Sequence, residues 1–164
     1  MKPPGEWAVE GRVNPKGIPC LYVASEEKTV ISEVRPWIGE YVSVARLRTV
    51  RSLKVVNCTG DEKERRVLLY AKPPSPDELK RAVWHEIDLA FAKPVERTDC
   101  FASYAPTQVL AEAFREIDFD GIAYRSNFGG GYNVAFFDLN AAEVVGQPWV
   151  VRVSTLDVGF ERVS

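Results

Sequence analysis

The sequence is poor in the residues that most often mark a metal or nucleophile site. It has one histidine and three cysteines in 164 residues. Cys20, Cys58 and Cys100 are widely separated and form no Cys-x-x-Cys pair, which argues against a zinc site or a disulfide framework. His85 has no histidine partner for a metal, and nothing near Cys100 supports a Cys–His nucleophile. We therefore expect no metal, and free thiols in a reducing, cytoplasmic compartment.

The sequence also lacks the features expected of a protein that binds a membrane or nucleic acid. No apolar run approaches the ~20 residues that span a bilayer, and the opening "MKPPGEW" lacks the apolar region of a signal peptide. The formal net charge is -2 and the pI is about 5.6, so there is no overall basic field for nucleic acid. Arg46, Arg48, Arg51 and Lys54 cluster locally, but their alternation is typical of the exposed face of a strand. We expect no membrane partner and no direct nucleic-acid partner.

What is present predicts one α+β domain. Hydrophobic residues make up 46% and charged residues 27%, which is ordinary for a soluble chain with a single core. Short strands are expected at 19–24 and around "GIAYRS", "NVAFFD", "AEVV" and "PWVVRV", with an extended segment over 41–56. Strands and helices do not alternate as in a doubly wound sheet, so we predict the α+β class.

Three helices are indicated by caps and apolar spacing. Ser25 is expected to cap a short helix that ends before Pro36 and turns one apolar face inward: Val30, Ile31 and Val34. In "SPDELKRAVWHEIDLAF", Ser75 and Glu78 form a capping box. The core stripe expected of that helix is Leu79, Val83, Ile87 and Phe91. The stripe expected of the helix at 106–117 is Val109, Leu110, Ala113, Phe114 and Ile117.

No standard nucleotide-binding motif is present. The run "SNFGGGYN" fits neither GxGxxG nor the P-loop, which needs a Lys-Ser/Thr pair. It is typical of a hairpin turn, since glycine readily supplies positive φ, and it also lets backbone approach a ligand closely. These two interpretations are compatible. Asp118 and Asp120, beside Gly121, are assigned to a turn rather than to a catalytic carboxylate pair.

One stretch combines three side chains that a core does not require. In "GRVNPKGIPCLYVASEEKTVISEVRP", residues 11–36, Arg12 precedes a turn, Tyr22 lies in a strand and Glu33 lies at the edge of a helix. Alone, each is an ordinary surface or core residue. Together they suit a charged, aromatic, phosphate-bearing ligand, because guanidinium binds phosphate and a ring face attracts a cation.

This stretch, extended through the following "WIGEYVSVA", together with "YAPTQVLAEAFREIDFDGIAYRSNFGGGYNVAFFD", resembles the RES domain, named for its Arg, Glu and Ser. The resemblance covers most of the chain, so residues 1–164 are treated as a single RES domain. It implies an ADP-ribosyltransferase-like fold with two packed, mainly antiparallel β-sheets and a few flanking helices. It also implies an enzyme that destroys NAD⁺ by phosphorolysis or hydrolysis of the nicotinamide–ribose bond. NAD⁺ is then a substrate, with phosphate or water as acceptor, and no cofactor is needed.

The resemblance further implies partners and site residues. Members are bacterial toxins, usually neutralised by an Xre-type helix-turn-helix antitoxin, with paired toxin subunits in the complex. The catalytic residues implied are Arg12, Glu33 and Ser126. The substrate-binding residues implied are Arg12, Tyr22, Ser126, Gly129, Gly130, Gly131 and Asn133. Val13 stands where many short toxins have an aromatic residue, so that wall of the nicotinamide pocket is not carried over, and nothing is carried over for residues 56–100.

These residues suit the implied chemistry. Nicotinamide leaves as a neutral molecule from a cationic start, so the main requirement is to stabilise an oxocarbenium-like ribose. Glu33 would oppose that charge, Arg12 would hold the pyrophosphate, and Tyr22 would face the cationic ring. Two alternatives stay open: a protein mono-ADP-ribosyltransferase on the same fold, and a non-catalytic binding module that retains it.

Overall fold

The computed structural model describes residues 8–59, 75–93, 103–128, 130–157 and 162, so Cys100 and Gly129 lie outside the described residues. The elements follow the chain in the order β1 (Leu21–Ala24), α1 (Glu27–Glu33), β2 (Tyr41–Thr49), β3 (Val55–Asn57), α2 (Pro76–Ala92), α3 (Ala105–Glu116), β4 (Gly121–Arg125), β5 (Tyr132–Phe136) and β6 (Ala142–Arg152). Of the helices described, none is long and apolar enough to cross a bilayer.

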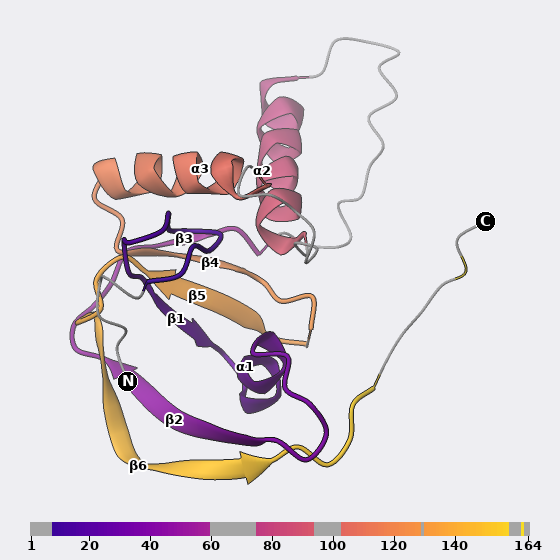
Figure 1. Cartoon of the computed structure of the whole chain (residues 1–164). Coiled ribbons are helices and arrows are strands. Elements are labelled where there is room, and N and C mark those ends of the chain that lie inside the picture. Colours follow the sequence, from indigo (N-terminus) through magenta and orange to yellow (C-terminus); the bar gives the residue numbers. More distant parts are fainter. Residues whose placement is uncertain (1–7, 60–74, 94–102, 129, 158–161, 163–164) are drawn as a thin grey trace.

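The strands form two sheets, as predicted for the α+β class. One has the order β1-β5-β4-β3, and the other pairs β2 with β6. All of these pairs are antiparallel except β3–β4, which is parallel. Figure 1 shows α2 and α3 on one side of the four-stranded sheet and the β2–β6 pair on the other, with α1 beside β1. The ADP-ribosyltransferase-like topology stays a prediction.

The core lies between the four-stranded sheet and helices α2 and α3. Side chains alternate across each strand, so Ile122 and Tyr124 in β4 share a face with Ala135 in β5. Phe91 of α2 is fully buried against this face, with its ring centroid 5.9 Å from that of Tyr124. The buried cluster is Val13, Cys20, Val56, Cys58, Phe91, Ala111, Ile122, Tyr124 and Ala135.

Helices α2 and α3 exist as predicted, but their buried faces differ from the predicted stripes. The capping box of Ser75 and Glu78 is confirmed. The stripe of α2 is wrong in its first half, because Leu79 and Val83 are 52% and 51% exposed while only the second half packs on the sheet. The stripe of α3 is wrong at Val109, Ala113 and Ile117, which are exposed; the helix instead buries Thr107 and Ala111.

The short helix also begins differently from the prediction. Glu26 is the N-cap of α1, and it makes no side-chain cap bond. The hydroxyl of Ser25 instead accepts a hydrogen bond from the Tyr132 N–H at 3.0 Å, which ties the start of α1 to β5. Val34, expected on the inward face of this helix, is 60% exposed.

Two strand predictions need correction. The segment 41–56 is divided between β2 and β3, which belong to different sheets. The segments "AEVV" and "PWVVRV" form one strand, β6, interrupted by an irregularity opposite Val44–Arg46. Gly146 lies there with φ of 74°, a left-handed conformation that glycine adopts without strain. The bulge lets β6 continue past "GQP" without ending the pairing.

The turn predictions are confirmed in outline. Strands β4 and β5 pair as a hairpin, with Arg125 opposite Tyr132. Gly130 and Gly131, however, are not among the glycines with positive φ.

Asp120 binds the Arg51 guanidinium at 2.5 Å and the Lys54 N–H at 2.8 Å, so it has a structural role at the turn. That ion pair holds the pKa of Asp120 below its usual value.

Candidate active site

Glu33 is the last residue of helix α1, a place that does not by itself suit a carboxylate. The C-terminal end of a helix carries partial negative charge from its unpaired carbonyls. The last turn of α1 contains no basic residue that would offset this charge. The Glu33 side chain therefore depends on donors from other elements.

Two such donors come from the hairpin of β4 and β5. The Ser126 hydroxyl donates to Glu33 Oε1 at 2.8 Å, and the Asn133 Nδ2 donates to the same oxygen at 2.5 Å. The Phe128 N–H donates to Ser126 Oγ at 3.1 Å, so the hydroxyl proton is left for Glu33. Ser126 and Asn133 are only 9% and 5% exposed. Among the described residues, no donor contacts Glu33 Oε2.

The phenol of Tyr124 is a member of this cluster that the sequence reasoning missed. Burial raises its pKa; the charge of Arg12 acts to lower that pKa, and the charge of Glu33 acts to raise it. The phenol is therefore within electrostatic range of both charged groups, and of Tyr104. A signal was available for Tyr124, because it precedes Ser126 by two positions and residues i and i+2 share a face of a strand. Tyr104, just before α3, gave no comparable signal.

Arg12 is joined to the end of helix α2. Its Nη1 donates to the Lys93 carbonyl, and the Asn127 side chain donates to the neighbouring Ala92 carbonyl. These bonds satisfy carbonyls that the end of a helix leaves without partners. The end of α2 thus places Arg12 and the residue after Ser126 on the same side of the sheet.

A buried ion pair supports the strand end that carries Ser126. Asp88 of α2 is 1% exposed and receives two hydrogen bonds from the guanidinium of Arg125, one of them from Nε at 3.1 Å. This bidentate geometry fixes Arg125 as well as neutralising the carboxylate. The residue next to Ser126 is therefore held by α2.

Tyr22 has one enclosed end and one open face. Its hydroxyl donates to Asn14 Oδ1 at 2.6 Å and accepts from the Val13 N–H at 3.1 Å. Burial of this end raises the pKa of Tyr22, although the residue as a whole is 40% exposed. The hydroxyl supports the loop that follows Arg12, and the contact of the ring with nicotinamide stays a prediction.

The glycine run has a packing role that its sequence did not reveal. A methyl group added to Gly131 would lie 2.5 Å from Ser25 Oγ and 2.9 Å from Thr29 Oγ1, so the hairpin approaches α1 too closely for a side chain. Gly130 faces open space. Thr29 is fully buried, and its hydroxyl has no hydrogen-bond partner within the described part of the chain. Substrate contacts by these glycines stay a prediction.

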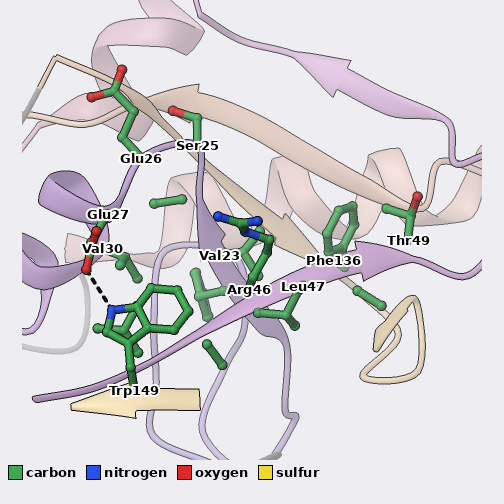
Figure 2. Close-up of a pocket in the computed structure, with 15 residues that line it drawn as sticks. Val23, Ser25, Glu26, Glu27, Val30, Arg46, Leu47, Thr49, Phe136 and Trp149 are labelled. Atoms are coloured by element: carbon green, nitrogen blue, oxygen red, sulfur yellow. Dashed lines mark hydrogen bonds between the residues drawn. The ribbon is translucent and has the colours of Figure 1, made fainter. Parts of the chain in front are cut away.

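A separate hollow of about 420 Å³ lies between the two sheets. Figure 2 shows it lined by Val23 and Phe136 of the four-stranded sheet, with Arg46 and Trp149 of the other sheet. The Trp149 indole N–H donates to Glu27 at its edge, at 2.8 Å. Its lining includes none of Arg12, Glu33 and Ser126, but it does include Tyr22, one of the predicted substrate-binding residues. The cluster around Glu33 is instead where three of the predicted polar residues meet.

The structure thus brings three of the predicted site residues into one hydrogen-bonded cluster. Glu33, Ser126 and Asn133 are in direct contact, and the charges of Arg12 and Glu33 both act on the pKa of Tyr124. A family model described as the RES domain matches residues 2–158. The chain belongs to the RES domain family.

This RES domain match extends over all the elements described above, so the site residues come from within the matched region. The family is associated with toxin–antitoxin systems and NAD⁺-related function. Searches of curated proteins and of solved structures found no match.

Proposed function

We propose that this RES domain degrades NAD⁺ by breaking its nicotinamide–ribose bond, with phosphate or water as the acceptor. The observation that carries the proposal is the state of the Glu33 carboxylate. One oxygen is bound by Ser126 and Asn133, and the other has no donor among the described residues. A carboxylate held in this way is preorganised to act on positive charge that develops during a reaction.

The proposed reaction balances without a cofactor. An oxygen of phosphate or water attacks the anomeric carbon of the ribose while the C–N bond breaks. The bonding pair passes to the pyridinium nitrogen, so nicotinamide leaves as a neutral molecule, and the proton of the attacking water or hydrogen phosphate is released to solvent. Glu33 Oε2 opposes the charge of the oxocarbenium-like ribose, as carboxylates do at other glycosyl centres. Arg12 binds the pyrophosphate, for which a planar guanidinium is well suited.

The reaction is tested by product analysis. Purified protein is incubated with NAD⁺, with and without inorganic phosphate, and products are identified by mass spectrometry. Phosphorolysis gives nicotinamide and ADP-ribose phosphorylated at the anomeric carbon, whereas hydrolysis gives nicotinamide and free ADP-ribose. Appearance of ADP-ribose on added protein, without loss of bulk NAD⁺, would indicate a mono-ADP-ribosyltransferase instead. No loss of NAD⁺ under any condition would contradict the proposal and favour a binding module.

The toxin role needs an inhibitor in trans, and the surface beside Glu33 is suited to one. The segment that follows α1 exposes Val34, Trp37, Ile38 and Tyr41, each between 60% and 74%. Large exposed apolar side chains gathered in one short segment are typical of protein interfaces. We propose that an Xre-type antitoxin covers this surface and the Glu33 site, with paired toxin subunits in the complex. An interface of standard size would bury roughly 1,600 Å² in total.

The toxin role is tested by bacterial growth after the chain is expressed alone. Growth should stop with the parent and continue with Glu33→Gln at equal soluble expression. Co-expression of the cognate antitoxin should restore growth, and replacing Trp37 and Ile38 by Ser should weaken that rescue. Equal growth of parent and variant, despite NAD⁺ turnover by the purified parent, would contradict the toxin role and leave the enzyme assignment intact.

A further inference from the structure

We infer that Asn133 is a positioning residue for Glu33, an inference that rests on the proposed function. Together with Ser126 it fixes one carboxylate oxygen and thereby directs the other toward the ribose. The resemblance to RES domains implied a different role for Asn133, a direct contact with substrate. The two roles make different predictions.

The geometry of Asn133 favours the positioning role. Its Nδ2 is 2.5 Å from Glu33 Oε1, and the side chain is 5% exposed, so this donor is already engaged before any ligand arrives. An amide group bound to a carboxylate in a buried place has little freedom to turn toward a substrate.

The place of Asn133 in the sheet gives it a fixed position. Strand β5 is flanked by β1 and β4, and Asn133 is paired with Ala24 on one side and Tyr124 on the other. Ser126, by contrast, lies just after β4, in the hairpin connection. A residue on a strand that is paired on both sides moves less than a residue in a turn. Asn133 is therefore the rigid member of the pair of donors.

The need for such positioning follows from where Glu33 lies. It ends a seven-residue helix whose last turn has no basic residue, so local structure does not hold its carboxylate. A displacement of about 1 Å in a reacting group can reduce a rate about 10²-fold. Loss of Asn133 should therefore act on the chemical step through Glu33 rather than on the binding of NAD⁺.

A double-mutant cycle separates the two roles. In the parent, Asn133→Ala should lower kcat about 10- to 100-fold while KM for NAD⁺ changes less than about threefold. In a Glu33→Gln background the same change should lower the residual rate by less than about threefold, because the carboxylate that Asn133 positions is already gone. Equal losses in both backgrounds, or a rise in KM that accounts for the loss, would overturn the inference.

A second measurement does not depend on turnover. Glu33→Gln with Asn133→Asp exchanges donor and acceptor, so the double variant should regain stability toward urea that each single variant loses, while kcat stays low. Additive losses of stability would show that the two side chains are not coupled, and would overturn the inference. If the parent fails to consume NAD⁺, the proposed function is wrong, and this stability cycle alone decides whether Asn133 positions Glu33.

Discussion

Helix α1 carries a carboxylate at each end, and the two ends have opposite surroundings. Glu27, in the first turn, is favoured by the helix dipole, is exposed, and receives a hydrogen bond from Trp149. Glu33, in the last turn, is disfavoured by the dipole and receives two hydrogen bonds from buried side chains. The stronger support lies where local structure is less favourable, which is the usual mark of a functional rather than a structural carboxylate.

The ion pairs on the two sheets differ in the same way. Asp88, which supports the end of β4, is 1% exposed, whereas Glu143 of the β2–β6 sheet pairs with Arg48 at 54% exposure. Four of the buried polar side chains, Asn14, Asp88, Ser126 and Asn133, lie around the candidate site. The polar groups around the candidate site are thus buried between the four-stranded sheet and its helices. The ion pair of the β2–β6 sheet, in contrast, is exposed to solvent.

The largest expected effect is on stability at the buried pair. Asp88→Ala leaves the Arg125 guanidinium without this carboxylate and should lower the free energy of unfolding by about 3–5 kcal/mol. Glu143→Ala, the matched change at the exposed pair, should cost no more than about 1 kcal/mol. Urea titrations followed by circular dichroism measure both. Similar losses in the two variants would remove the distinction between the sheets.

The next effect is on catalysis, and it contrasts the two ends of α1. Glu33→Gln should lower the rate of NAD⁺ loss about 10²- to 10³-fold, because an amide cannot oppose the developing positive charge. Glu27→Gln changes the same atoms at the other end of the helix and should alter the rate less than about twofold. Both variants should remain folded at the assay temperature, which thermal unfolding checks. A folded Glu33→Gln protein with parental turnover would remove Glu33 from the mechanism.

A smaller effect is expected where the hairpin touches α1. Gly131→Ala places a methyl group against Ser25 and Thr29, and should cost about 1–3 kcal/mol of stability. Gly130→Ala enters open space one residue earlier and should be neutral, or stabilising by up to about 1 kcal/mol. Thermal unfolding of the two variants provides the comparison. Equal tolerance at both positions would mean that close approach does not explain Gly131.

The smallest effect concerns the unpaired hydroxyl of α1. Thr29→Val keeps the shape of the side chain and removes a buried hydroxyl that has no partner in the described part of the chain. Stability should rise by about 1 kcal/mol or stay unchanged, since desolvating that group brings no compensating bond. A clear loss of stability on thermal unfolding would mean that the hydroxyl has a favourable contact.

The sequence predicted which polar side chains meet more reliably than it predicted which apolar side chains are buried. Arg12, Glu33 and Ser126 could be proposed because their types and order are specific, and two of them prove to be in contact. The exposure of Leu79 and Val109 could not be predicted, because periodicity shows that a helix has an apolar face but not whether the sheet reaches it. The cap at Ser25 failed for a related reason: its hydroxyl is used by Tyr132 in a distant strand.

The order in which the chain is synthesised gives the Glu33 contacts a further meaning. Ser126 lies 93 residues after Glu33, and Asn133 lies 100 residues after it. At roughly 5–20 residues per second, about 5–20 s of translation separate Glu33 from the residue that positions it. A chain interrupted before the β4–β5 hairpin contains the carboxylate without either donor. Under the proposed function, therefore, cleavage of NAD⁺ begins only after the β4–β5 hairpin has been synthesised.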